Sequence, residues 1–221
     1  MEDFFNYRRR KSSIVNIGNT PLGGDNPIRI SIHCGDVCQA IRMIEAGAEY
    51  VRFTAQGERE ARNLGVIRKQ LSEAGYTTPL VADIHFNPRA ADAAAEEVEK
   101  VRINPGNYVD KVKTFDLLEY TDEEYAAELQ KIRDRFIPFL NICKAHGTAI
   151  RIGVNHGSLS DRIMSRYGDT PEGMVASCME FLRICRDENF PDVVISIKAS
   201  NTVVMVKTVR LLVRTMEAED M

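Results

Sequence analysis

The sequence lacks an apolar run long enough to cross a membrane, and it lacks an excess of positive charge. A membrane-spanning helix needs about 20 consecutive apolar residues, and no such run occurs in the 221 residues. The formal net charge is −3, from 29 Lys and Arg against 32 Asp and Glu. This balance excludes the broad basic surface of a protein that binds nucleic acid or an anionic membrane. We therefore expect a cytoplasmic protein with neither of these partners.

Cysteine is scarce and scattered. An odd number without the spacing of a disulfide framework indicates a reducing compartment. Only two of the cysteines are close in sequence, and a structural metal site needs about four ligands, so we expect no metal site. A basic stretch near the N-terminus has no apolar core after it, so we expect no signal peptide. The cysteines are Cys34, Cys38, Cys143, Cys178 and Cys185.

The chain alternates short apolar runs with helical patterns. We expect strands at 27–32, 50–54, 80–83, 100–103, 149–154 and 192–198. We expect helices at 37–46, 57–74, 88–97, 158–167 and 201–216, one more opening at the Thr170 cap, and a long one opening at Thr121 and breaking before Pro138. Between the fourth strand and Thr121 runs a long connection, 105–120.

This alternation predicts an α/β fold with a parallel sheet. No glycine-rich fingerprint follows any expected strand, which weighs against an open dinucleotide-binding sheet. Polar residues at several strand ends favour a TIM-type (β/α)8 barrel, whose chemistry gathers at the carboxyl ends of its strands. Only six of the eight units are present in residues 1–221. We therefore expect an incomplete barrel, truncated after its sixth unit, with an exposed final strand prone to association.

Polar residues recur at the ends of five expected strands. Side chains two apart on a strand point to the same face. Together they would bring four cations and one carboxylate to one mouth, which suits a multiply anionic small molecule such as a phosphate or diphosphate ester. The pairs are Arg52/Thr54, Asp83/His85, Arg102/Asn104, Arg151/Asn155 and Lys198/Ser200.

Two local motifs add to this pattern. The turn at Pro105-Gly106 predicts free backbone N–H groups facing an anion. Gly157 and Ser158 open a short expected helix, whose start favours phosphate. His156, beside them, has the character of a bystander. A lysine such as Lys198 at a strand end is suited either to phosphate binding or to Schiff-base chemistry, and the nearby arginines favour phosphate.

At these residues the chain resembles the 4-hydroxy-3-methylbut-2-en-1-yl diphosphate synthase family. The matching segments cover most of the 221 residues. Residues 156–162 are similar to the corresponding stretch in the long form of the family, which carries an extra domain. The matching segments are 16–18, 21–24, 45–48, 81–86, 101–107, 151–158 and 198–201. The region 31–36 departs from the family, because it runs directly into a helix where a longer loop is usual.

The resemblance implies an enzyme of non-mevalonate isoprenoid biosynthesis that reductively opens 2-C-methyl-D-erythritol 2,4-cyclodiphosphate. It implies a [4Fe–4S] cluster, ferredoxin or flavodoxin as electron donor, and a homodimer. On this interpretation residues 1–221 form the substrate-binding barrel, while the family's catalytic glutamate, extra domain and cluster-binding domain lie beyond them. We then expect no iron and no turnover from this chain. The expected substrate-binding residues are Arg52, Asp83, His85, Arg102, Asn104, Arg151, Asn155, Ser158 and Lys198.

Two alternatives remain open at this point. One is a different phosphate-binding barrel enzyme, of the pterin-binding or Schiff-base lyase type. The other is a phosphate-binding module without catalysis.

Overall fold

A six-stranded parallel sheet forms the centre of the computed structural model, which describes residues 10–110 and 119–221. The strands follow one another in chain order across the sheet, so every connection joins neighbours. This is the strand order of a barrel wall and confirms the expected parallel α/β fold of TIM-barrel type. The strands are β3 (Ser31–His33), β4 (Tyr50–Thr54), β5 (Leu80–Asp83), β6 (Lys100–Ile103), β7 (Ala149–Asn155) and β8 (Val193–Lys198).

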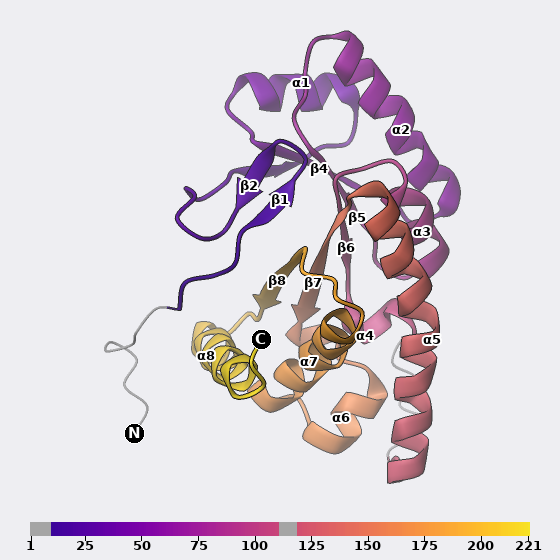
Figure 1. The fold of residues 1–221 in the computed structure, drawn as a ribbon, viewed down its shortest axis with the longest axis vertical. Coiled ribbons are helices and arrows are strands. Elements are labelled where there is room, and N and C mark those ends of the chain that lie inside the picture. Colours follow the sequence, from indigo (N-terminus) through magenta and orange to yellow (C-terminus); the bar gives the residue numbers. More distant parts are fainter. Residues whose placement is uncertain (1–9, 111–118) are drawn as a thin grey trace.

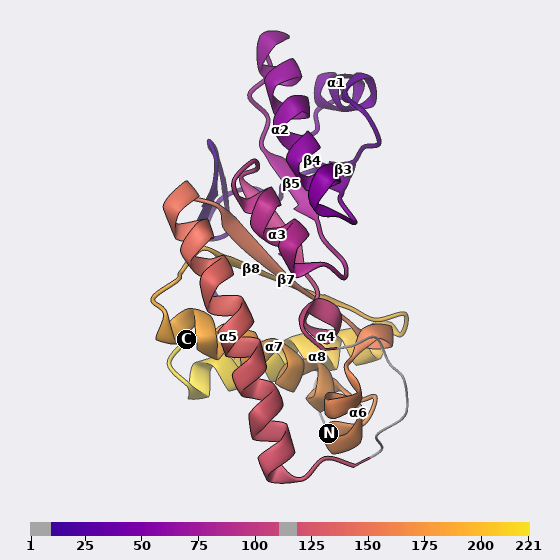
Figure 2. The ribbon, with the colours of Figure 1, turned by 90° about the vertical axis from the view of Figure 1, so that its right-hand side faces the viewer.

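Helices between successive strands cover the outer face of the sheet (Figure 1). Figure 2, turned by 90°, shows α3 and α5 in front of the strands. The longer helices are α1 (Val37–Glu45), α2 (Glu58–Glu73), α3 (Pro88–Ala95), α5 (Asp122–His146), α7 (Pro171–Asp187) and α8 (Thr202–Ala218). Shorter turns are α4 (Pro105–Tyr108), η1 (His156–Ser158) and α6 (Asp161–Tyr167). Part of the long connection expected at 105–120 lies outside the described residues.

The two faces of the sheet differ in chemistry because side chains alternate along each strand. The outer face is apolar and packs against the helices as the main core, with members such as Val51, Ala82, Val101 and Ile150. The strand register places Arg52 opposite Val81, Asp83 opposite Arg102, and Arg102 opposite Arg151 on the other face. The inner face therefore carries the polar side chains.

A small antiparallel hairpin, β1 (Val15–Ile17) and β2 (Thr20–Leu22), packs against the inner face where the strands begin. In Figure 1 it lies on the side of the sheet away from α2 and α3. Val15 and Ile17 form a second buried cluster with Tyr50, Val81 and Ala149, and the Tyr50 hydroxyl donates to the Thr20 carbonyl at 2.8 Å. The hairpin therefore covers the inner face at the strand starts.

Helix caps agree with the sequence patterns. Thr121 and Glu124 form the expected capping box at the start of α5, with bonds of 3.2 and 2.9 Å. The expected break before Pro138 is wrong, because α5 runs from Asp122 to His146 with Pro138 inside it. Phe136 and Phe139 are fully buried on either side of the proline, and their packing offsets the lost backbone bond.

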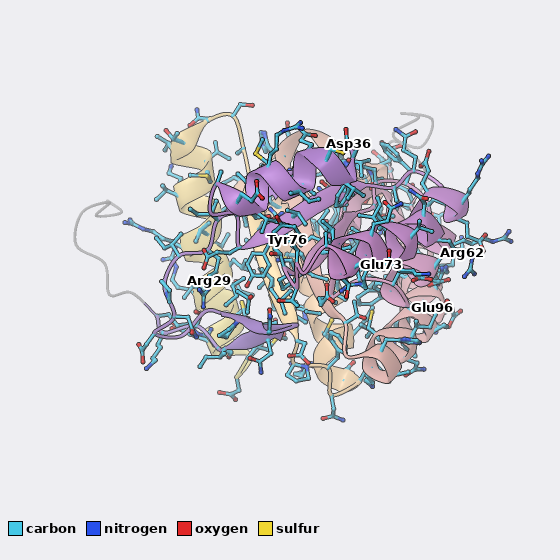
Figure 3. All side chains as sticks on the ribbon, turned by 90° about the horizontal axis from the view of Figure 1, so that it is seen from above. Arg29, Asp36, Arg62, Glu73, Tyr76 and Glu96 are labelled. Atoms are coloured by element: carbon cyan, nitrogen blue, oxygen red, sulfur yellow. The ribbon has the colours of Figure 1, made fainter. Side chains whose placement is uncertain are left out.

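Carboxylates neutralise arginines along the helical layer. Arg62 of α2 lies 3.5 Å from Glu96, the residue that ends α3, and both are labelled in Figure 3. Arg135 on α5 similarly contacts Asp92 on α3 at 2.5 Å. Of the described helices, none is long and apolar enough to cross a membrane.

Candidate functional site

Four cations from four strands lie on the inner face of the sheet, towards the carboxyl ends of the strands. We call them the cation cluster: Arg52 of β4, Arg102 of β6, Arg151 of β7 and Lys198 of β8. The sequence pattern predicted this convergence, and the register and the mutual electrostatic effects of these groups place them together. Among the described residues, the ion pairs that the cluster makes all go to one carboxylate, that of Asp83.

Asp83 is the shared counter-ion of the cluster. Its Oδ1 accepts a hydrogen bond from Arg102 Nη1 at 3.2 Å, and its Oδ2 lies 3.5 Å from Arg52 Nε. His85 Nε2 lies 3.7 Å from the same Oδ1. A single negative charge thus faces two arginines, which leaves the inner face with a surplus of positive charge that favours a bound anion.

Arg102 is the most deeply buried member of the cluster, with 2% of its surface exposed. Its Nη2 donates to the Gly153 carbonyl at 3.2 Å, so its fork is held between β5 and β7. Burial lowers the pKa of Arg102, and the Asp83 carboxylate opposes this effect. At any physiological pH the guanidinium stays charged.

Arg151 and Lys198 carry the surplus charge. Arg151 Nε donates to Ser196 Oγ at 3.0 Å, a neutral partner. Burial lowers the pKa of Arg151, and Arg102 and Arg52 lower it further. Burial also lowers the pKa of Lys198, and Arg102 and Arg151 lower it further. The positive charge of each group therefore disfavours the charged form of its neighbours.

His85 lies at the edge of this cluster. Burial lowers the pKa of its imidazole below the ordinary value, and three members of the cation cluster lower it further, although Asp83 opposes them. A neutral imidazole is therefore favoured near pH 7. It can accept or donate one hydrogen bond to a bound molecule.

A set of amide and hydroxyl groups borders the cations. Asn104 Nδ2 donates to Ser158 Oγ at 2.9 Å, and Ser158 Oγ donates to the Asn155 carbonyl at 3.3 Å. These three predicted residues therefore lie together, between the ends of β6 and β7. His156 Nε2 lies 3.1 Å from the Asp169 carboxylate.

The expectation of free backbone N–H groups at Pro105-Gly106 is wrong. The Gly106 N–H donates to the Asn104 side chain at 3.3 Å, which caps α4. Gly106 is also packed so tightly that a Cβ there would lie 1.7 Å from the Ser158 carbonyl oxygen. The turn therefore positions Asn104 and Ser158 and offers no N–H group to an anion.

Two buried polar atoms of predicted site residues have no hydrogen-bond partner among the described residues. They are Arg52 Nε, a donor, and Asn155 Oδ1, an acceptor. Buried polar groups are nearly always satisfied. A ligand with both anionic and hydroxyl groups is the kind of molecule that would satisfy this pair.

Sequence reasoning missed three polar residues of the inner face. Lys100 precedes Arg102 by two positions, and Ser196 precedes Lys198 by two, so the alternation that found the strand ends extends to both. His33 of β3 lies beside Arg52 in the register, with its Nε2 3.1 Å from Thr54 Oγ1. The expected strand, 27–32, stopped one residue before His33, whereas the observed strand is Ser31–His33.

The cysteines do not gather. Four are buried and Cys38 is exposed, and all five are free thiols. Burial raises the pKa of Cys143, Cys178 and Cys185, so these thiols stay protonated. Within 10–110 and 119–221, no three His, Cys, Asp or Glu side chains are arranged to hold a metal ion.

Comparison with known proteins identifies the family. Residues 12–219 match the model of the GcpE TIM-barrel domain. The chain is 84% identical, over 99% of its length, to 4-hydroxy-3-methylbut-2-en-1-yl diphosphate synthase (flavodoxin) of Parabacteroides distasonis, of which it covers 37%. It is 56% identical to the enzyme of that name from Porphyromonas gingivalis, matching over 100% of this chain and 39% of the relative.

A plant relative extends the comparison. The chloroplastic enzyme of rice, named for ferredoxin, is 48% identical over 97% of this chain and 30% of its own length. The chain therefore spans between 30% and 39% of the length of these three relatives. Since the family model covers almost all of its residues, this chain belongs to the GcpE TIM-barrel domain family.

Proposed function

We propose that the inner face of the sheet binds the diphosphate of 2-C-methyl-D-erythritol 2,4-cyclodiphosphate. The chain would be the substrate-binding barrel of an enzyme that reductively opens this ring to 4-hydroxy-3-methylbut-2-enyl diphosphate. One observation carries the proposal: four cations from four strands lie on one face, and among the described residues only two of them, Arg52 and Arg102, pair with a carboxylate, that of Asp83. The names of the relatives supply the reaction class.

The residues divide the work by their chemistry. Arg102 and Arg151 present planar forks suited to phosphate oxygens, and Lys198 contributes a point charge at the mouth. Asp83 holds Arg102 in place through its 3.2 Å bond. Asn104, Asn155, Ser158 and His85 provide neutral hydrogen-bonding groups for the hydroxyl-bearing carbons of the ligand.

The reductive step requires electrons, and we propose that a [4Fe–4S] cluster and ferredoxin or flavodoxin supply them in the longer enzyme. The cysteines of this chain do not fit a cluster, because they are dispersed and four are buried. Cluster ligands would therefore come from other residues of the longer protein, which we propose to be a homodimer. The role of this chain is to bind and orient the ligand.

Titration calorimetry of the 221-residue chain with the cyclodiphosphate, and with inorganic diphosphate, tests the proposal. We expect binding that weakens as salt is added, since the contacts are ionic. Lys198→Met should weaken binding about tenfold or more, because a charged hydrogen bond contributes roughly 1.5–3 kcal/mol. Lys198 is exposed at the end of β8, so its loss should leave the fold intact.

Arg62→Met provides the matched control. Arg62 is a charged residue on the outer surface, paired with Glu58 and Glu96, and it lies on the opposite side of the sheet from the cluster. It should leave the affinity unchanged. Equal affinities for wild-type protein and Lys198→Met would overturn the proposal.

A second function is favoured by one observation. Burial and three arginines lower the pKa of Lys198, although Asp83 opposes them, and the lowered pKa increases the fraction of free amine available for Schiff-base formation. Borohydride reduction in the presence of a small aldehyde, followed by mass mapping, tests it. A stable adduct on Lys198 would favour a lyase-type reaction, and unmodified Lys198 would exclude one.

A further inference from the structure

Lys100 is a buried lysine on the inner face that the proposed binding site does not use. It begins β6, and only 6% of its surface is exposed. No hydrogen bond or ion pair joins its ammonium group to any of the described residues. A buried charge without a carboxylate partner is expensive and is usually associated with a function.

The surroundings of Lys100 are apolar on three sides. Val81 and Ala149 flank it in the register of the sheet. The Tyr50 ring lies below it, with the Lys100 Nζ 4.5 Å from the ring centroid, a distance suited to a cation–π contact. The hairpin residues Val15 and Ile17 seal this layer from the strand starts.

The side towards the cation cluster is different. Lys100 lies two residues before Arg102 on the same face of β6. The charged groups that act on it are Arg151 of the neighbouring strand β7 and Arg52 of β4, two strands away, and both are positive. Lys100 therefore lies one layer deeper than the cluster, within electrostatic reach of it.

We propose that Lys100 is a further cation of this anion site, which acts from beneath the cluster and takes up a proton when an anion binds. The inference rests on the proposed function, because it needs an anion at the cluster. Lys100 is a positioning residue here: it stabilises the bound charge through space and does not contact it. The proton comes from the solvent, and the ammonium forms as the anion enters.

The charges around Lys100 explain why its protonation should be coupled to anion binding. Burial, together with Arg151 and Arg52, lowers the pKa of Lys100 to about 8. Part of the population is then neutral in mildly alkaline solution. A bound anion offsets the two arginines, so the charged form of Lys100 is favoured again. The affinity of the site for the anion should therefore decline as the pH rises above 8.

The test uses the 221-residue chain with ¹³Cε-labelled lysine and inorganic sulfate, whose charge does not change in this pH range. NMR titration follows each lysine with sulfate, and with sodium chloride at the same ionic strength. We expect the Lys100 signal, assigned by its absence in Lys100→Arg, to titrate well below the other lysines in chloride. In sulfate it should titrate at clearly higher pH. Lys100→Met should bind sulfate about fivefold more weakly.

The variants separate charge from proton uptake. Lys100→Arg keeps a permanent charge, so it should bind sulfate with an affinity that no longer falls above pH 8. A Lys100 signal that titrates with the other lysines, or that ignores sulfate, would overturn the inference, even if Lys100→Met fails to fold.

The signal of Lys198 distinguishes the two proposals. If Lys198 responds to sulfate and Lys100 does not, the inference fails and the proposed anion site stands. If neither lysine responds and diphosphate does not bind, both fail.

Discussion

The guanidinium of Arg102 lies directly against the backbone of Gly153. Its Nη2 donates to the Gly153 carbonyl at 3.2 Å, and a Cβ on Gly153 would come within 2.5 Å of Arg102 Nε. Glycine is therefore needed at position 153 for the arginine to reach across to β7. The most buried cation of the cluster depends on the smallest residue of the neighbouring strand.

Gly153→Ala should displace Arg102 and weaken diphosphate binding about tenfold, the loss expected for one charged hydrogen bond. Calorimetric titration measures the change. Gly57→Ala is the matched control, because a Cβ at Gly57 would meet nothing within 4 Å. If both variants bind as the wild type does, Arg102 does not need its present position.

Asp83→Asn removes the shared counter-ion while keeping the side-chain shape. We expect the free energy of unfolding to fall by roughly 3–5 kcal/mol in low salt, because the buried Arg102 loses its partner. Diphosphate should restore more stability to this variant than to the wild type, since an anion replaces the lost charge. Urea unfolding with and without diphosphate measures both effects. A variant as stable as the wild type without anion would contradict the role of Asp83.

Lys100 should make stability depend on pH in alkaline solution. Its pKa is lowered from 10.5 to about 8 in the folded chain, so the unfolded chain holds more protons between these values. Stability linked to Lys100 should therefore rise with pH from about 8 to about 10.5, by an amount on the order of 1–3 kcal/mol. The comparison is with Lys100→Met, which should lack this rise. Parallel pH profiles for the two proteins would exclude the effect.

A buried ion pair between two helices offers a structural contrast. Arg162 of α6 makes two bonds to Glu180 of α7, of 2.6 and 2.9 Å, and the Tyr125 hydroxyl donates to the same carboxylate at 2.5 Å. Glu180→Gln should lower the free energy of unfolding by about 3–5 kcal/mol. Diphosphate affinity should stay unchanged at temperatures where the variant is folded. A change in affinity would connect this helical layer to the anion site.

The polar strand ends could be read from the sequence because the alternation of a strand is strict. Once strand 100–103 is recognised, Arg102 and Asn104 must share a face, and the structure places them so. Lys100 follows the same rule, and an analysis confined to strand ends overlooked it. How deeply an inner-face residue such as Lys100 is buried, in contrast, depends on which element covers the strand starts.

That element, the hairpin of β1 and β2, was not predicted. Gly18-Asn19 is a two-residue turn signal, and Gly18 has a positive φ of 55°. Pro21 in the second strand argues against a strand there, and the packing of Ile17 into the second buried cluster overrides it. The continuation of α5 past Pro138 has the same origin. In both cases tertiary packing decides what local preference cannot.

The unequal count of charges on the inner face has a practical consequence. With one carboxylate among four cations, the inner face carries uncompensated positive charge, which attracts anions from solution. If the proposed site binds anions, phosphate or sulfate in the purification buffer should occupy it. A ligand affinity measured in such a buffer would then report the exchange of a buffer anion for the ligand, and its value would depend on the buffer as well as on the protein.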